Sequence, residues 1–293
     1  MKLSSYCMNC LVNRQMENIK DYEDEELKSK YMKRVLNTIS EANEQETAPV
    51  IIAKINQLHQ EYFGVPYSFE ALKKQYNILM LQKEESIWNK IQASDDSLLE
   101  ALKYSRIGNY IDFGAMGSID DDKLNNLLES VHEEYIETSQ YQAFTKDLHS
   151  AGKLVYLTDN CGEVVLDKLF IKCIRSLYPE IHVTVIVRGK MVLNDATMED
   201  AMMIGLTEIE DVIGNGTEIA GTCLEQIDKK AKDCIDAADV IISKGQGNFE
   251  TLNGCGLNIY YIFLCKCEWF VKRFKLEQFK GVFINDRDCT QIE

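Results

Sequence analysis

The sequence has no long apolar run and no excess of positive charge. Of its 293 residues, 47 are Asp or Glu and 32 are Lys or Arg, which gives a net charge of -15 at pH 7. Such a chain, without a basic stripe interleaved with aromatic residues, repels phosphate backbones and is not expected to bind nucleic acid. No segment approaches the roughly 20 apolar residues of a membrane-spanning helix, and residues 1–15 lack a signal-peptide core. We therefore expect a cytoplasmic protein with no membrane partner.

Closely spaced metal-binding motifs are also scarce. The four histidines lie far apart, and no internal repeat or low-complexity tract is present. The ten cysteines are scattered, mostly among apolar or small residues, and with no export signal we expect reduced thiols that act as packing side chains. Cys7 and Cys10 form the one C-x-x-C pair. Its spacing suits half a zinc site or a redox pair, but it has no twin, so packing, metal binding and redox chemistry stay open.

The two parts of the chain have different hydrophobic rhythms. Between about residues 8 and 93 the pattern is helical, as in the buried stripe of Ile51, Ile55, Leu58 and Tyr62. Pro49 suits the first turn of that helix, and Ser68 is a plausible cap for the next. We expect an N-terminal helical region over residues 1–95 and a second domain over residues 96–293.

Short apolar runs rich in β-branched and aromatic residues appear in the second part. They cover residues 154–157, 183–187, 240–242, 259–264 and 282–284. Such runs are typical of strands buried on both faces. Helical stretches lie between most of them, such as residues 163–177 and 222–237, and a shorter helix is expected over 197–204. This alternation predicts an α/β domain with a mainly parallel, Rossmann-like sheet covered by helices.

Polar residues follow the first two runs of the sheet. Asp159 and Asn160 come directly after one run, and Asp195 lies a few residues after the next. Ligands of an open parallel sheet bind outside the carboxyl ends of its strands, although either Asp could simply cap the helix that follows it. Two carboxylates and an amide that converge form an oxygen-only ligand set, which suits Mg²⁺ or Mn²⁺ better than zinc. A cation would also relieve the repulsion between the carboxylates.

A third junction, residues 243–248, places Lys244 after a strand and before the glycines at 245 and 247. Glycines let backbone N–H groups approach a ligand, so a phosphate fits here, although such a turn is often structural. The Gly spacing of a Walker A loop is missing. Together with a metal, Lys244 would supply the local positive charge that the acidic surface lacks.

Five segments in the same order resemble the metal-dependent damage-control phosphatase family, formerly domain of unknown function 89 and related to the acidic-residue or carbohydrate-phosphate phosphatases. The segments are Thr158–Glu163, Asn194–Asp200, Lys244–Glu250, Gly108–Gly114 and Cys7–Cys10, and they span nearly the whole chain. Cys7–Cys10 is the segment that marks the stand-alone microbial branch. Cys161 replaces a more usual Ala, and Met191 a common Pro. Both changes put loop geometry in doubt rather than the metal ligands.

The resemblance implies an N-terminal helical region on a three-layer α/β/α domain and hydrolysis of phosphate monoesters, typically sugar phosphates or damaged or surplus metabolites. It also implies a divalent metal (Mn²⁺ or Mg²⁺, with Co²⁺ or Ni²⁺ as alternatives) on Asp159, Asn160 and Asp195. In the expected mechanism Lys244 and backbone N–H groups near Gly245 and Gly162 hold phosphate. A metal-activated water or a carboxylate such as Asp159 is the nucleophile.

Further roles remain expectations with structural alternatives. Asn109, Asp112 and Asn248 are candidate substrate contacts, though Asp112 could be a solvated turn residue. Glu163 could transfer a proton or only favour its helix dipole, and Arg188 could reach phosphate or be a surface charge. A non-catalytic phosphometabolite-binding protein and a transferase that uses adenosylmethionine or a nucleotide are the rival functions, the latter without a G-x-G-x-x-G run. The physiological substrate and the oligomeric state stay open.

Overall fold

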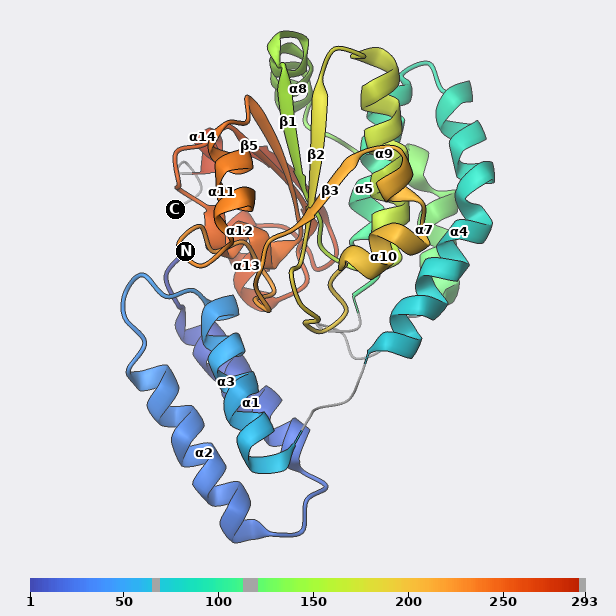
Figure 1. Cartoon of the computed structure of the whole chain (residues 1–293). Helices are drawn as coiled ribbons and strands as arrows, with labels where there is room; N and C mark the ends of the chain where they lie inside the picture. Colours follow the sequence, from blue (N-terminus) through green and yellow to red (C-terminus); the bar gives the residue numbers. More distant parts are fainter. Residues whose placement is uncertain (65–68, 113–120, 290–293) are drawn as a thin grey trace.

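The structure is a computed structural model that describes residues 1–64, 69–112 and 121–289 (Figure 1). A six-stranded sheet has the order β3-β2-β1-β4-β5-β6, and every neighbouring pair is parallel except β5 with β6. The strands are β1 (Lys153–Leu157), β2 (His182–Val187), β3 (Asp211–Gly214), β4 (Val240–Lys244), β5 (Ile259–Leu264) and β6 (Gly281–Asn285). The predicted α/β class with a mainly parallel, Rossmann-like sheet is confirmed.

Helices cover both faces of this sheet, so the domain has three layers. On one side lie α4 (Glu70–Ala93), α5 (Ser97–Gly108), α7 (Asp121–Glu129), α8 (Thr138–Ser150), α9 (Glu163–Leu177) and α10 (Met198–Met203). On the other lie α11 (Lys229–Asp236), α12 (Gln246–Leu252), α13 (Glu268–Phe274) and α14 (Asp286–Cys289). Short 3-10 helices are η1 (Val131–Glu133) and η2 (Leu206–Glu208).

One apolar core lies on each face of the sheet, and successive residues of a strand alternate between the two cores. Along β1, Tyr156 packs into the core shared with α5 and α9, whereas Leu157 packs into the core shared with α11 to α13. β4 behaves alike, with Ile242 in the first core and Ile241 in the second. Successive side chains point to opposite faces of a strand, so position in the strand decides which helices a residue meets.

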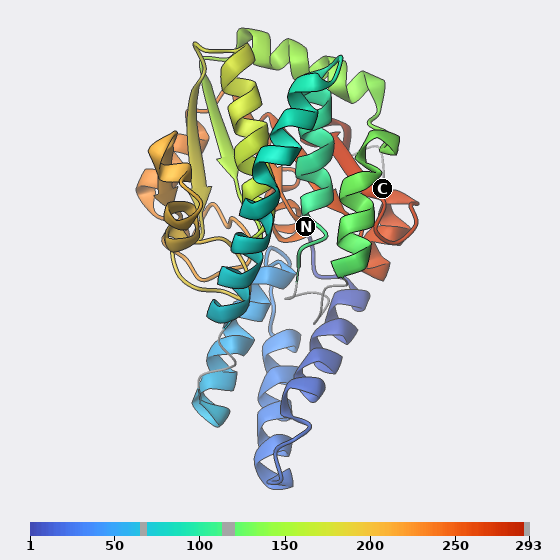
Figure 2. The ribbon, with the colours of Figure 1, turned by 90° about the vertical axis from the view of Figure 1, so that its right-hand side faces the viewer.

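Three helices at the N-terminus form a separate bundle. They are α1 (Ser5–Ile19), α2 (Glu25–Ser40) and α3 (Ala48–Phe63), and their own core includes Leu11, Val35 and Ile55. Pro49 lies in the first turn of α3, as predicted. The bundle extends from the end of the α/β layers where α12 and α13 begin (Figures 1 and 2), and α3 contacts α12 while α1 contacts α13.

The fourth helix packs with the sheet rather than with this bundle. Met80, Ile87 and Ile91 of α4 belong to the same core as Phe170 of α9. The two helices lie side by side (Figure 2). The change of packing partner therefore lies between α3 and α4. The division expected from the sequence lies later, at residue 95.

Two local predictions need correction or fall outside the described residues. The segment 222–228 is not helical, because Thr222 is held to α12 by hydrogen bonds to Thr251 and Asn248, and α11 begins only at Lys229. The four-residue strand β3 was not predicted. The predicted cap Ser68, and Phe113 and Gly114 of the glycine-containing turn, lie outside the described residues.

Two isoleucines of α4 test this packing. Ile87 is 4% exposed in the core, whereas Ile78 is 40% exposed on the same helix. We expect Ile87→Ala to lower the free energy of unfolding by about 2–5 kcal/mol, since it removes buried methyl groups and leaves a cavity. Ile78→Ala should change it by less than about 1 kcal/mol. Urea unfolding followed by circular dichroism measures both, and equal effects would contradict the assignment of α4 to the sheet's core.

Candidate active site

The loops that follow β1 and β2 pair with each other at the carboxyl end of the sheet. Cys161 N donates to Asn194 O at 2.9 Å, Ala196 N donates to Asp159 O at 2.7 Å, and Asn160 forms an isolated bridge with Asp195. The strand order places β2 and β4 on either side of β1, so the connections that follow β1 and β3 lead to opposite sides of β1. Such a switch point opens a crevice at the strand ends. The structure thus brings together the three predicted metal ligands.

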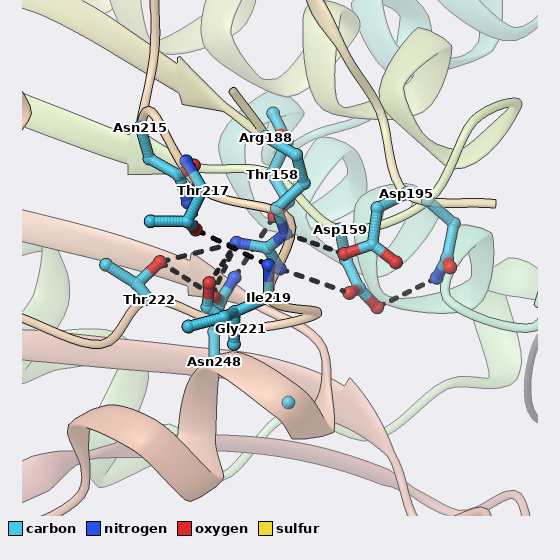
Figure 3. A network of polar contacts seen from close by, with 12 residues as sticks. Thr158, Asp159, Arg188, Asp195, Asn215, Thr217, Ile219, Gly221, Thr222 and Asn248 are labelled. Atoms are coloured by element: carbon cyan, nitrogen blue, oxygen red, sulfur yellow. Dashed lines mark hydrogen bonds and ion pairs between the residues drawn. The ribbon is translucent and has the colours of Figure 1, made fainter. Parts of the chain in front are cut away.

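Arg188, at the end of β2, joins the two carboxylates (Figure 3). Its Nε donates to Asp195 Oδ2 at 2.6 Å, and its Nη2 lies 3.8 Å from Asp159 Oδ1. On the other side, Nη1 donates to Gly221 O at 2.9 Å and to Asn248 Oδ1 at 3.0 Å. The side chain is buried, and within the described ranges Nη2 has no hydrogen-bond partner. Arg188 is therefore an internal counter-charge of the site rather than a surface residue.

Burial disfavours the charged forms of Asp159 and Asp195. Loss of water raises the pKa of Asp159 well above its usual value, and the nearby Glu163 and Asp195 raise it further. Burial likewise raises the pKa of Asp195, against the opposing effect of Arg188. A carboxyl whose charged form is disfavoured in this way gains from any added positive charge. The site is suited to a cation.

The oxygen atoms around Asp159, Asn160 and Asp195 fit a cation. Among the described residues, no hydrogen bond reaches Asp195 Oδ1, and Asp159 Oδ1 has only the long Arg188 contact, so each carboxylate keeps an oxygen for a ligand. The Asn160 amide turns its Nδ2 toward Asp159 Oδ2 and Glu163 Oε2, both at 2.8 Å, while its Oδ1 accepts from Asn194 at 2.8 Å. The second lone pair of that oxygen is what Asn160 would offer. No group of three or more His, Cys, Asp or Glu in the described ranges is placed to hold a metal. The set that fits is two carboxylates with an amide.

Lys244 and Glu163 do not have their predicted roles. Both side chains are fully buried, and they pair at 2.8 Å. Lys244 Nζ also donates to Asp167 Oδ1 at 2.5 Å and to Ser105 Oγ at 2.8 Å. An ammonium sealed among protein acceptors is not available to phosphate, and a carboxylate held in this way has no exposed path for proton transfer. The reason is strand parity, because Lys244 faces the same side as Ile242, toward α5 and α9.

The N–H groups of the two glycines themselves are paired within the protein. Gly245 N donates to Ile262 O at 3.0 Å, and Gly162 N donates to Asn77 Oδ1 at 2.6 Å, so neither expected N–H group is free for phosphate. A Cβ on Gly245 would lie 2.0 Å from Asp159 Oδ2, which shows how closely the turn approaches that carboxylate. Asn248 is also buried, with its amide bonded to Thr158 O and Lys244 O. The predicted substrate contacts of Gly245 and Asn248 are corrected accordingly.

The remaining predicted contacts differ in depth. Asn109 is buried beneath the site, where its Nδ2 donates to Asp159 Oδ2 at 3.0 Å and to Glu163, and its Oδ1 accepts from Leu264 N. It supports a carboxylate and does not face a substrate. Asp112 pairs through Oδ2 with Lys266 Nζ at 2.7 Å. Asp112 also adds to the negative potential at both Asp159 and Asp195.

Lys266 is a site residue that the sequence reasoning missed. It follows β5, the next strand after β4, and its charge favours the ionised form of Asp159. The signal is present in the sequence, because Lys266 stands at a fourth strand end. Lys73 and Asn77 of α4 were also missed: Lys73 pairs with Asp200 at 2.7 Å, and Asn77 holds Gly162 and Asp200. No local sequence pattern predicts that α4 contacts the loops after β1 and β2.

All ten cysteines are free thiols. Cys7 is half-buried near the start of α1 and Cys10 is exposed. Burial raises the pKa of the Cys7 thiol, and the Ser4 hydroxyl donates to its Sγ at 3.0 Å. Their packing, metal-binding and redox roles stay predictions.

Two glycines with nearly equal φ angles test the close approach at the site. Gly245 has φ +81° and lies against Asp159, whereas Gly254 has φ +83° and a Cβ added there would meet nothing within 4 Å. Gly254→Ala should cost about 1–2 kcal/mol of unfolding free energy from backbone strain alone. We expect Gly245→Ala to cost more, because it adds a clash with the carboxylate. Urea unfolding compares the two, and equal costs would refute the tight approach.

Known proteins resemble this chain over most of its length. Residues 3–282 match the family described as "Damage-control phosphatase ARMT1-like domain". A damage-control phosphatase of Archaeoglobus fulgidus is 29% identical over 92% of this chain and 93% of its own. One of Pyrococcus horikoshii is 27% identical over the whole of both chains.

A solved structure shows the same fold. The crystal structure of a DUF89 family protein from Pyrococcus horikoshii has a TM-score of 0.79 at 25% identity and covers 98% of this chain and 99% of that one. Together these likenesses support a phosphatase. The chain belongs to the damage-control phosphatase family with an ARMT1-like domain.

Proposed function

We propose that the chain is a metal-dependent phosphatase that hydrolyses phosphate monoesters of small metabolites, such as sugar phosphates or damaged or surplus phosphometabolites. The observation that carries the proposal is the pair of buried carboxylates, Asp159 and Asp195, each with one oxygen left for a ligand beside Arg188. A site of this kind at the switch point of a parallel sheet suits an anionic substrate only when a cation is also present.

In this proposal Asp159, Asn160 and Asp195 hold one divalent cation, Mn²⁺ or Mg²⁺, with Co²⁺ or Ni²⁺ as alternatives. When bound, the cation supplies Lewis-acid polarisation of a phosphate oxygen and activation of water. The set consists of hard oxygen donors, which favour these ions over softer ones.

The chain's own cations orient the phosphate. Arg188 Nη2 is buried, lacks a hydrogen-bond partner within the described ranges, and points between the carboxylates, so it is placed to donate to a phosphate oxygen. Lys266 is a second donor, 5% exposed in its side chain and paired with Asp112. A phosphate that reaches Lys266 competes with Asp112 for the ammonium. These two residues take the place that the sequence had suggested for Lys244.

Release of inorganic phosphate tests the proposed function. The purified chain is incubated with a panel of sugar phosphates and with an aryl phosphate, without metal and with Mg²⁺, Mn²⁺, Co²⁺ or Ni²⁺. We expect metal-dependent release, lowered at least about 100-fold in Asp159→Ala and in Asp195→Ala, since each removes a charge that faces the reacting group. Asp233→Ala, an exposed carboxylate of α11, should retain the wild-type rate.

The outcomes separate the rival functions. Binding of phosphate esters without release under any metal would favour the non-catalytic binding protein. Tight binding of adenosylmethionine with no phosphate release would favour the transferase. Full activity in both aspartate variants would refute the site.

Lys266 gives a second, finer test. We expect Lys266→Met to raise KM for a phosphate ester about tenfold or more with a smaller change in kcat, because it removes one charge-assisted hydrogen bond to the substrate. Lys229→Met is the control, since Lys229 is exposed on α11. Steady-state kinetics over the two variants measure the effect.

Asp112→Asn distinguishes two roles for that carboxylate. If Asp112 shields Lys266, its loss should lower KM for phosphate esters. A raised KM would instead restore the sequence-based expectation that Asp112 contacts the substrate.

A further inference from the structure

A fully buried charge cluster lies beneath the two aspartates of the site. Its members are Lys244 at the end of β4 together with Glu163 and Asp167 of α9. The lysine ammonium donates to both carboxylates and also to Ser105 O at 2.7 Å and Ser105 Oγ. All three side chains have no exposed surface. Because nothing from solvent reaches this cluster, its effect on chemistry must pass through neighbouring residues.

Two asparagine amides make that connection. Asn109 Nδ2 donates to both Glu163 oxygens, at 3.1 and 3.0 Å, and Asn160 Nδ2 donates to Glu163 Oε2 at 2.8 Å. The same two amides donate to Asp159 Oδ2, at 3.0 and 2.8 Å. Each amide therefore lies between two carboxylates. Glu163 thus fixes the two amides, and the amides in turn fix Asp159.

The far side of each amide is fixed as well. Leu264 N donates to Asn109 Oδ1 at 3.0 Å, and Asn194 Nδ2 donates to Asn160 Oδ1 at 2.8 Å. These contacts define which end of each amide is the oxygen. With Nδ2 of both amides on Asp159 Oδ2, the other oxygen of Asp159 is the one that Arg188 approaches and that is left for a ligand.

Glu163 and Asp167 use their oxygens differently. Lys244, Ser105 and Tyr156 all bond to Asp167 Oδ1, whereas Oδ2 has no partner among the described residues. Glu163 instead uses both oxygens, with Lys244 on Oε1 and Asn160 on Oε2. The ammonium thus fixes the one carboxylate that orients the amides.

We propose that Lys244 is a positioning residue, which acts through Glu163 to fix the amides of Asn109 and Asn160 on Asp159. The proposal deepens the proposed function, because it takes Asp159 and Asn160 as the groups that meet the metal. It gives the third sequence motif a role under the site, in place of contact with substrate.

Glu163→Gln and Asp167→Asn form a matched pair of tests. Each removes one buried negative charge from the same cluster. Asn at 167 still accepts all three bonds through its oxygen, whereas Gln at 163 replaces an accepting oxygen with a donor that faces either an amide or the ammonium. A merely structural role of the cluster predicts equal effects of the two changes.

The first readout needs no metal. In protein labelled with ¹⁵N-asparagine, the side-chain NH₂ signals of Asn109 and Asn160 are assigned from Asn109→Ser and Asn160→Ser, and their hydrogen exchange is measured. We expect protected signals in the wild type and in Asp167→Asn, and lost protection in Glu163→Gln. The double change Lys244→Met with Asp167→Asn keeps the net charge of the cluster and should also lose protection, because Glu163 then lacks its ammonium.

The second readout is Mn²⁺ affinity by calorimetry, with thermal unfolding as a check on folding. We expect about 10- to 100-fold weaker binding in Glu163→Gln and in the double variant, and less than about threefold change in Asp167→Asn. Unchanged amide protection in Glu163→Gln, or equal loss in Asp167→Asn, would overturn the proposal. Should the wild type bind no Mn²⁺ while amide protection changes as expected, the positioning role stands and the metal part of the proposed function fails.

Discussion

The balance of buried charge at the strand ends determines the rest of the site. Two buried cations each join two carboxylates: Arg188 reaches Asp159 and Asp195, and Lys244 reaches Glu163 and Asp167. Breaking such a pair by removing one partner leaves an uncompensated buried charge, at a cost of about 3–5 kcal/mol. The two groups are not independent, because the amides of Asn109 and Asn160 connect Asp159 with Glu163. Site geometry and stability therefore rest on the same side chains.

The fold makes this concentration of charge possible. Parallel strands end at one edge of the sheet, and the loops after β1 and β2 pair there through backbone hydrogen bonds. Glycines then allow protein groups to approach each other: Gly245 lies against the Asp159 carboxylate, and a Cβ on Gly247 would lie 2.0 Å from Ala220 O. The charged groups around this approach are buried, among them Asp159, Glu163 and Lys244. The acidic groups consequently depend on fixed partners rather than on solvent.

The sequence predicted the edge where the site forms better than it predicted the direction of each side chain. Asp159, Asn160 and Asp195 could be placed together because strand ends are visible as the ends of apolar runs. Lys244 was misread because a basic residue before glycines suggests phosphate, while its period-two relation to Ile242 already directs it toward α5 and α9. Other placements depend on contacts between distant parts of the chain, which local patterns do not encode. These are the positions of Lys73, of Asn77 and of the Gly221 carbonyl that accepts from Arg188.

The net charge of -15 adds a constraint on how an anion enters. The positive groups near the site are already engaged, Arg188 by the two aspartates and Lys266 by Asp112. A phosphate ester thus gains binding energy at Lys266 only by displacing the Asp112 carboxylate. Asp112 then regains its hydration while the phosphate gives up part of its own. Under the proposed function, a cation on Asp159 and Asp195 would reduce their hold on Arg188 and leave its unpartnered Nη2 for the substrate. Cation binding and phosphate binding would then favour each other, because the cation would compensate the charge of the two carboxylates and leave Arg188 for the phosphate.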